Sequence, residues 1–126
     1  MDIPEPSIQD LKNTFAQDRF TQLLGIEIVE LARGYAKAAC TIREDMLNFL
    51  GLPHGGAIFS LADAAFAAAS NSHGQKAVAL NVNISYLAAA RSGDRLYAQA
   101  REEKLGKRTA LYTIRVTNEE DQPIAI

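Results

Sequence analysis

An unpaired carboxylate, Asp63, lies in the middle of a stretch that is otherwise made of small and apolar residues, GGAIFSLADAAFAAASNSHG at 55–74. Its helical neighbours, Phe59, Ser60, Phe66 and Ala67, offer no positive partner. Burying such a carboxylate is costly unless it is hydrogen-bonded or protonated. Asp63 is therefore either a structural residue paired with a backbone amide or a second chain, or a nucleophile or general base of raised basicity.

His54, Gly55 and Gly56 come directly before or at the start of this stretch. The glycines let a ligand approach the backbone, and a helix N-terminus presents free N–H groups and the positive end of its dipole. This favours an oxyanion site, although the same residues also occur in ordinary flexible loops. Asn48, six residues before His54, carries an amide that could orient a water or hold a carboxylate, or could simply serve a turn.

The spacing between the glycines and the carboxylate decides how they could work together. Gly56 and Asp63 are seven residues apart, which is roughly 10 Å along a helix axis. A carbonyl polarised at the helix N-terminus therefore cannot also meet the carboxylate of the same helix. If both act on one substrate, they come from two chains packed antiparallel, and catalysis predicts a homodimer with two equivalent sites at its interface.

The elements that must position these residues follow an α+β pattern. The predicted order is a helix over 7–20, strands over 24–32 and 35–43 that meet at Arg33-Gly34, a loop over 44–54, a helix over 55–73, and strands over 77–88, 94–104 and 108–117. A last strand begins at Pro123 and is cut short where the sequence stops at Ile126.

The helix over 55–73 is apolar or small on nearly every face, so we expect it to be buried all round. A curved antiparallel sheet wrapped around it would provide that burial, and residues 1–126 form a single domain. Residues 77–88 alternate, which places Val78, Leu80 and Val82 on one face of a predicted strand.

Composition narrows the classes of function. The 13 Lys and Arg residues against 15 Asp and Glu give a net charge of −2, which argues against a nucleic-acid partner. The single cysteine, Cys40, allows no internal disulfide, fits a reducing compartment and excludes a zinc site built on several cysteines. The first residues lack a basic start followed by an apolar run, so we expect no signal peptide, and Asp63 argues against a membrane span. We expect a cytoplasmic protein without metal that contacts no membrane.

The pattern N-x₂-G-x₂-H-G-G-x₆-D is formed by Asn48, Gly51, His54, Gly55, Gly56 and Asp63. It resembles the hotdog-fold acyl-CoA thioesterases of the phenylacetate-degradation (PaaI-like) group, and the predicted strand order is similar to theirs over residues 8–126. The resemblance implies hydrolysis of an aryl- or medium- to long-chain acyl-CoA to free acid and CoA. It implies no cofactor beyond the CoA of substrate and product, and a homodimer that pairs into a tetramer.

The resemblance also implies a role for each matched residue. Asp63 of the partner chain acts as nucleophile or activates water, and the Gly55 amide, with that of Gly56, polarises the thioester carbonyl. Asn48 positions water or substrate, and His54 supports the loop and contacts the thioester. Contacts with CoA are implied at Tyr86, Arg91, Lys104, Gly106, Lys107 and Arg108. We expect Phe59 and Phe66 to line the acyl pocket.

Some features leave other functions open. Where some relatives carry a serine near the reacting centre, this chain has Ala79, so one hydroxyl that would position water is missing. The KLGKR turn at 104–108 is also a common solubilising hairpin tip, and His73 is expected to be a charge partner at the helix C-terminus. A hotdog hydratase or dehydratase acting on an acyl-CoA double bond and a non-catalytic acyl-CoA-binding module remain alternatives.

Overall fold

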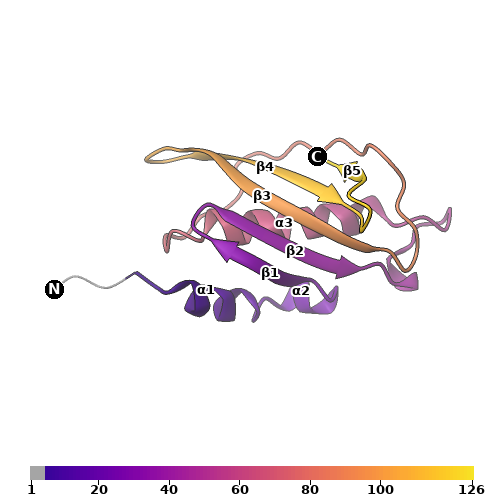
Figure 1. Cartoon of the computed structure of the whole chain (residues 1–126), viewed down its shortest axis with the longest axis horizontal. Helices are drawn as coiled ribbons and strands as arrows, with labels where there is room; N and C mark the ends of the chain where they lie inside the picture. The colour runs from indigo at the N-terminus through magenta and orange to yellow at the C-terminus, as the bar shows by residue number, and fades with distance from the viewer. Residues whose placement is uncertain (1–4) are drawn as a thin grey trace.

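The computed structural model describes residues 5–126, in which five antiparallel strands form one sheet in chain order (Figure 1). The strands are β1 (Glu27–Ala32), β2 (Tyr35–Thr41), β3 (Arg95–Leu105), β4 (Ala110–Thr117) and β5 (Pro123–Ala125). The helices are α1 (Ile8–Phe15), α2 (Arg19–Leu23) and α3 (Gly55–Ser70), with a 3-10 turn η1 (Glu44–Met46). Because α3 packs against β1 to β4, the prediction of a hotdog fold is confirmed.

Small residues on the inner face of the sheet let α3 lie close to it. Ala36 and Ala38 on β2 and Ala98 and Ala100 on β3 are fully buried, and α3 turns Leu61 toward them. With no side chain larger than a methyl group on this part of the sheet, the helix backbone can approach the strands and exclude water from both.

The central helix departs from the prediction in two ways. It ends at Ser70, before the predicted end at 73, because the Asn71 side chain accepts from the Ala77 N–H at 2.9 Å and turns the chain back. The expectation that it is buried all round is wrong. Gly56, Asp63 and Ala67, with the half-buried Ser60, form a stripe of small side chains along one face that the rest of the described chain does not cover.

The N-terminal helix predicted over 7–20 is in fact two helices. Ser7 caps α1 through the Asp10 N–H at 3.0 Å, as its sequence position indicates. Asp18 then caps a separate helix, α2, by accepting from the Thr21 N–H at 3.1 Å. Since an N-cap residue has an extended backbone, the chain cannot continue as one helix through Asp18.

Residues 77–88 were predicted as a strand, and the structure assigns no strand there. Only the end of the segment pairs, with the C-terminus: the Ser85 N–H donates to Ile126 O and the Leu87 N–H to Ile124 O, both at 2.8 Å. The segment thus runs along the sheet edge beyond β5, and Val78 and Leu80 are 94% and 85% exposed. A strand needs backbone hydrogen bonds to a neighbouring strand, and residues 77–84 make none within the described part of the chain.

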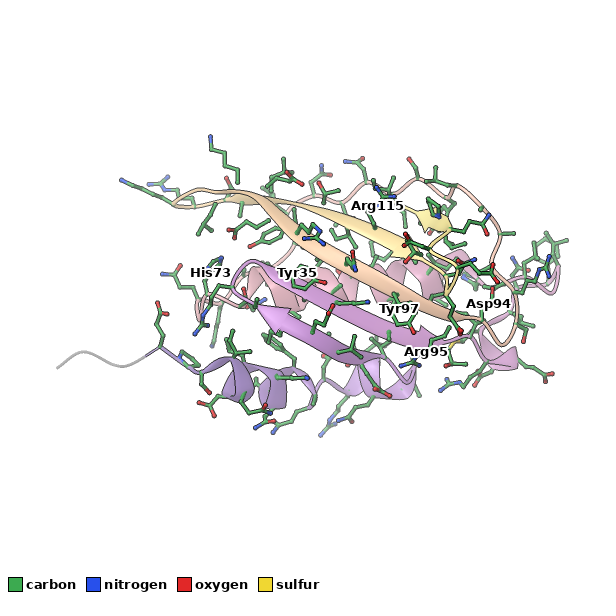
Figure 2. The ribbon with its side chains drawn as sticks, in the orientation of Figure 1. Tyr35, His73, Asp94, Arg95, Tyr97 and Arg115 are labelled. Atoms are coloured by element: carbon green, nitrogen blue, oxygen red, sulfur yellow. The ribbon has the colours of Figure 1, made fainter. Side chains whose placement is uncertain are left out.

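The sheet face turned away from α3 carries aromatic rings paired with cations (Figure 2). Lys37 lies 4.8 Å and Arg95 5.9 Å from the centre of the Tyr97 ring, and Arg101 lies 5.0 Å from that of Tyr35. The charged groups of these lysine and arginine side chains lie over the rings, so this face remains polar.

Candidate active site

Asp63 lies between two hollows on either side of α3. The larger, of about 270 Å³, is called the acyl hollow here. On its helix side it is lined by Phe59, Ala62, Asp63 and Phe66, and its other wall comes from β4, residues 82–85 and the C-terminus. The second hollow, of about 200 Å³, lies between α3 and the α1–α2 region and also reaches Asp63. The structure therefore brings both predicted pocket aromatics into one hollow with the carboxylate.

The Asp63 carboxylate has no hydrogen-bond or salt-bridge partner among the described residues. Partial burial raises its pKa, and the negative charge of Asp18 across the second hollow raises the pKa further. A carboxylate that is neither paired nor fully hydrated holds a proton more readily than an ordinary aspartate. This arrangement suits a general base.

The loop before α3 is a rigid structure rather than a flexible one. Asn48 Oδ1 accepts from the Leu50 N–H at 2.9 Å and the Leu52 N–H at 3.1 Å, so its oxygen is used within the loop and only its amide nitrogen remains to meet a substrate or water. Gly51 adopts φ of +76°, which favours glycine. The His54 N–H donates to Met46 O at 2.7 Å and fixes the start of the helix.

The two glycines at the helix start are not equivalent. The Gly56 N–H donates to His54 Nδ1 at 2.8 Å, so the His54 ring caps the helix and occupies one of the two predicted oxyanion donors. The Gly55 N–H has no acceptor within the described residues. Gly55 therefore offers the free donor at the positive end of α3.

Tyr86 supports this helix start. Its hydroxyl donates to Gly55 O at 2.9 Å, and a Cβ on Gly55 would lie 3.1 Å from the same hydroxyl. The family resemblance implied a contact between Tyr86 and CoA, and the structure places the Tyr86 hydroxyl against the backbone of the expected oxyanion donor. A side chain at position 55 would require the tyrosine hydroxyl to move by a few tenths of an ångström.

Within one chain the oxyanion donor and the carboxylate do not meet. Gly55 and Asp63 belong to the same helix, and eight residues of helix separate them by about 12 Å. The separation agrees with the one expected from the sequence. The Gly55 N–H and the Asp63 carboxylate of one chain therefore cannot act on the same thioester.

Apart from Tyr86, the residues predicted to bind CoA fall into two groups. Lys104, Gly106, Lys107 and Arg108 lie exposed at the β3–β4 turn, where the Gly106 N–H donates to Thr109 O at 2.9 Å. Arg91 lies in the turn before β3, with its N–H bonded to Asp94 Oδ2 at 2.9 Å. The whole length of β3 separates the groups, roughly 33 Å at the usual rise per residue. One CoA cannot reach both in a single chain.

Two residues of the site were missed by sequence reasoning. Asp18 was read as part of a continuous helix, and its place before Arg19 as an N-cap was the available signal. Tyr112 lines the acyl hollow together with Ile114 and Val116. The alternation of these three along the predicted strand over 108–117 could have placed them on the inner face.

The usual requirements of a metal site and of a membrane-spanning helix can be compared with residues 5–126. Among residues 5–126, no three His, Cys, Asp or Glu side chains gather closely enough to hold a metal ion. No helix in the same range is long and apolar enough to cross a bilayer.

Known proteins are similar to this chain in sequence and in fold. A model of the Thioesterase superfamily matches residues 50–125. The acyl-coenzyme A thioesterase PaaI of Escherichia coli K12 is 37% identical over 118 residues, 94% of this chain and 84% of that protein. The solved structure of the E. coli PaaI protein from the phenylacetic acid degradation operon has a TM-score of 0.89 at 38% identity, covering 93% of this chain and 85% of that one.

A second solved structure agrees with the first. The TT0310 protein from Thermus thermophilus gives a TM-score of 0.83 at 41% identity, covering 86% of this chain and 92% of that one. Similarity of this extent covers the central helix, the loop before it and the sheet together. The chain therefore belongs to the thioesterase superfamily, as a hotdog-fold thioester hydrolase of the PaaI-like group.

Proposed function

We propose that the protein hydrolyses the thioester of an aryl- or medium- to long-chain acyl-CoA to the free acid and CoA. The observation that carries this proposal is Asp63, an unpaired carboxylate with a raised pKa at the wall of an apolar hollow of about 270 Å³. Such a hollow is large enough for a ring or a short alkyl chain. The named activity of the E. coli relative supports the choice of a CoA thioester.

The reaction needs an oxyanion donor and a base or nucleophile. The Gly55 N–H would hold the carbonyl oxygen as it becomes negative, and the positive end of α3 adds to this stabilisation. Asp63 either takes a proton from the attacking water or attacks the carbonyl carbon itself to give an anhydride that water then opens. In both routes the C–S bond breaks, and the CoA thiolate leaves and takes up a proton. Water is the only co-substrate.

We propose that each site is completed by a second copy of the chain. The stripe of Gly56, Ser60, Asp63 and Ala67 would let a second α3 approach antiparallel, which places one chain's Gly55 beside the other's Asp63. The unpaired edge at 77–82, with Val78 94% and Leu80 85% exposed, supports the same arrangement. An exposed apolar sheet edge is a natural site for pairing with another chain. The proposal extends to a pair of such dimers.

The dimer also accounts for the two separate groups of cations. The Lys104, Lys107 and Arg108 side chains would bind CoA phosphates as an exposed cationic turn, and Arg91 would serve a CoA held mainly by the partner chain. In this arrangement the two groups do not need to meet in one chain.

We expect Leu80→Asp to convert the dimer to a monomer. A charge at the unpaired edge cannot be buried against a second copy without a large desolvation cost. Light scattering at micromolar concentration should show the mass of a single chain, 13.7 kDa, in place of the larger mass of the wild-type assembly. Leu23→Asp, at a leucine of α2 that is 67% exposed, is the matched control and should leave the mass unchanged. A wild-type protein that is already monomeric would overturn the two-chain site.

The test of the proposed function is thiol release from a panel of acyl-CoAs, detected with a colour reagent. The panel runs from acetyl through long-chain to phenylacetyl and hydroxyphenylacetyl esters. Release of CoA supports the proposal, and the preferred ester identifies the acyl class. Hydration of an enoyl-CoA without thiol release would instead support a hydratase. Acyl-CoA esters that raise the melting temperature without turnover would support a binding module.

The pH dependence of kcat/KM tests the electrostatics of Asp63. Because burial and Asp18 raise its pKa, the acidic limb should lie above the ordinary aspartate value of about 3.9. Asp18→Asn removes a negative neighbour while keeping a good N-cap, so the pKa of Asp63 falls and the limb moves to lower pH. The control Asp45→Asn, at an exposed residue paired with Arg43, should leave the limb in place. An unmoved limb in Asp18→Asn would show that Asp18 does not tune the base.

A further inference from the structure

Three side chains that the proposed reaction does not use, those of His73, Glu102 and Tyr112, form a hydrogen-bonded cluster just beyond the end of α3. Figure 2 labels His73. The Tyr112 hydroxyl donates to Glu102 Oε1 at 2.7 Å, and His73 Nε2 lies 2.7 Å from the same oxygen. An ionised carboxylate only accepts hydrogen bonds, so His73 Nε2 carries the proton in this contact. A neutral imidazole with its proton on Nε2 can donate this bond. Segments far apart in sequence thus meet at one oxygen.

The backbone around Glu102 is itself fixed. The Glu102 N–H donates to Gly34 O at 2.9 Å, and a Cβ on Gly34 would lie 3.0 Å from Glu102 Oε2. Ser72, which is fully buried, accepts from the Gly34 N–H and donates to Ala69 O, both at 2.7 Å. The β1–β2 turn, the end of α3 and β3 are therefore held as one unit, and the carboxylate has little freedom to move.

The other side of Tyr112 faces the acyl hollow. Its ring lines the hollow beside Phe66, with ring centroids 5.6 Å apart and planes tilted by 55°, a favourable arrangement for two aromatic rings. Phe66 follows Asp63 by three residues, about 4.5 Å along the helix. Tyr112 is thus a wall of the hollow close to the reacting centre, and its hydroxyl is anchored outside the hollow.

The charges of the cluster keep this anchor in place. The hydrogen bonds from Tyr112 and His73 lower the pKa of Glu102, so its carboxyl stays an ionised acceptor at neutral pH. Burial and the neighbouring Glu102 raise the pKa of Tyr112 well above its usual range, so the phenol stays a donor. Neither the Glu102 carboxylate nor the Tyr112 phenol changes its protonation state near neutral pH.

We propose that Tyr112 determines which acyl groups the hollow accepts, with Glu102 and His73 as positioning residues that hold its ring. The inference rests on the proposed function and adds the residue that limits the size of the acyl group. An anchored ring is a fixed wall, and an apolar pocket with a fixed wall distinguishes acyl groups that differ by one methylene by about tenfold or more. Without its anchor, the ring would tilt and the distinction would weaken.

The experiment measures kcat/KM for each ester of the acyl-CoA panel in a set of variants. Tyr112→Phe keeps the ring and removes only the anchor, and Glu102→Ala removes the acceptor. Both should lower the ratio of kcat/KM between the best ester and the larger esters by about three- to tenfold. Because the two variants lose the same bond, the double variant should show the ratio of either single variant.

Two further variants separate positioning from stability. Glu102→Gln keeps an acceptor oxygen for Tyr112 and should retain the wild-type ratio, and Glu103→Ala, at the exposed neighbour on β3, should do the same. A wild type that releases thiol, with unchanged ratios in Tyr112→Phe and Glu102→Ala, would overturn the inference even if melting temperatures fall. A wild type that releases no thiol from any ester would overturn the proposed function itself and with it the inference.

Discussion

Replacing Asp63 should abolish most of the activity while leaving the fold intact. We expect Asp63→Asn and Asp63→Ala to lower the rate of thiol release at least about a hundredfold, since a positioned general base contributes roughly 10²- to 10⁴-fold to a rate. The measurement is kcat for the best ester of the panel, made on wild type and variants side by side. Asp63→Asn keeps the shape of the side chain while removing its negative charge and its capacity to accept a proton or attack the carbonyl, so it separates the chemistry from packing.

The stability of the Asp63 variants is part of the prediction. Asp63 makes no hydrogen bond within the described residues, and partial burial opposes its charge. Removing it therefore breaks no contact of the single chain, and the melting temperature should not fall. Asp45→Asn is the matched control and should keep full activity. A variant of Asp63 that works at the wild-type rate would exclude both the base and the nucleophile role.

Local turn chemistry explains why much of the fold could be predicted. Gly34 has φ of +76°, and the Arg33-Gly34 turn that joins β1 to β2 was predicted from its position between two strand-like segments. The other sheet strands begin and end within three residues of their predicted bounds, because alternation and turn residues are local signals. The start of α3 at Gly55 was likewise visible in the residues before it.

The parts that were wrong depend on information outside the local sequence. The strand predicted over 77–88 has the right alternation, but within the described residues only its end pairs with another segment. The stripe on α3 around Asp63 shows the same limit, because its side chains are small, in a helix predicted to be buried, yet they are uncovered in one chain. Both departures expose surfaces that a second copy would cover, so an apolar pattern predicts burial without saying which chain provides it.

Long-range contacts also limited the prediction of the site. Asp63 and the residues before α3 could be singled out because their types are unusual at those positions. The contact of the Tyr86 hydroxyl with Gly55 O joins residues 31 apart in sequence, and that of Tyr112 with Glu102 depends on the register of β3 and β4. Nothing in a single sequence fixes such pairs, so neither the supported oxyanion donor nor the anchored pocket wall could be derived from it.

Two inactive variants should restore each other if the site is shared between chains. Gly55→Pro deletes the N–H donor, and proline is well tolerated at the first helical position, where His54 already has the extended backbone that a following proline requires. The Tyr86 hydroxyl, 3.1 Å from the position of a Cβ, must shift slightly to admit the ring. Loss of one oxyanion donor should lower kcat about 10²- to 10³-fold.

Mixing Gly55→Pro with Asp63→Asn under conditions that let subunits exchange forms dimers that contain one chain of each kind. Such a dimer has one site with both defects and one site with none. At equal amounts, half of the dimers are mixed and one of their two sites works, so the mixture should recover about one quarter of the wild-type activity. If Gly55 and Asp63 of the same chain served one substrate, no mixed dimer would contain an intact site, and the activity would stay at the level of the separate variants. Gly55 and Asp63 of one chain are about 12 Å apart along α3, the rise of eight helical residues. The recovered fraction therefore measures directly whether a second chain supplies the partner group at each site.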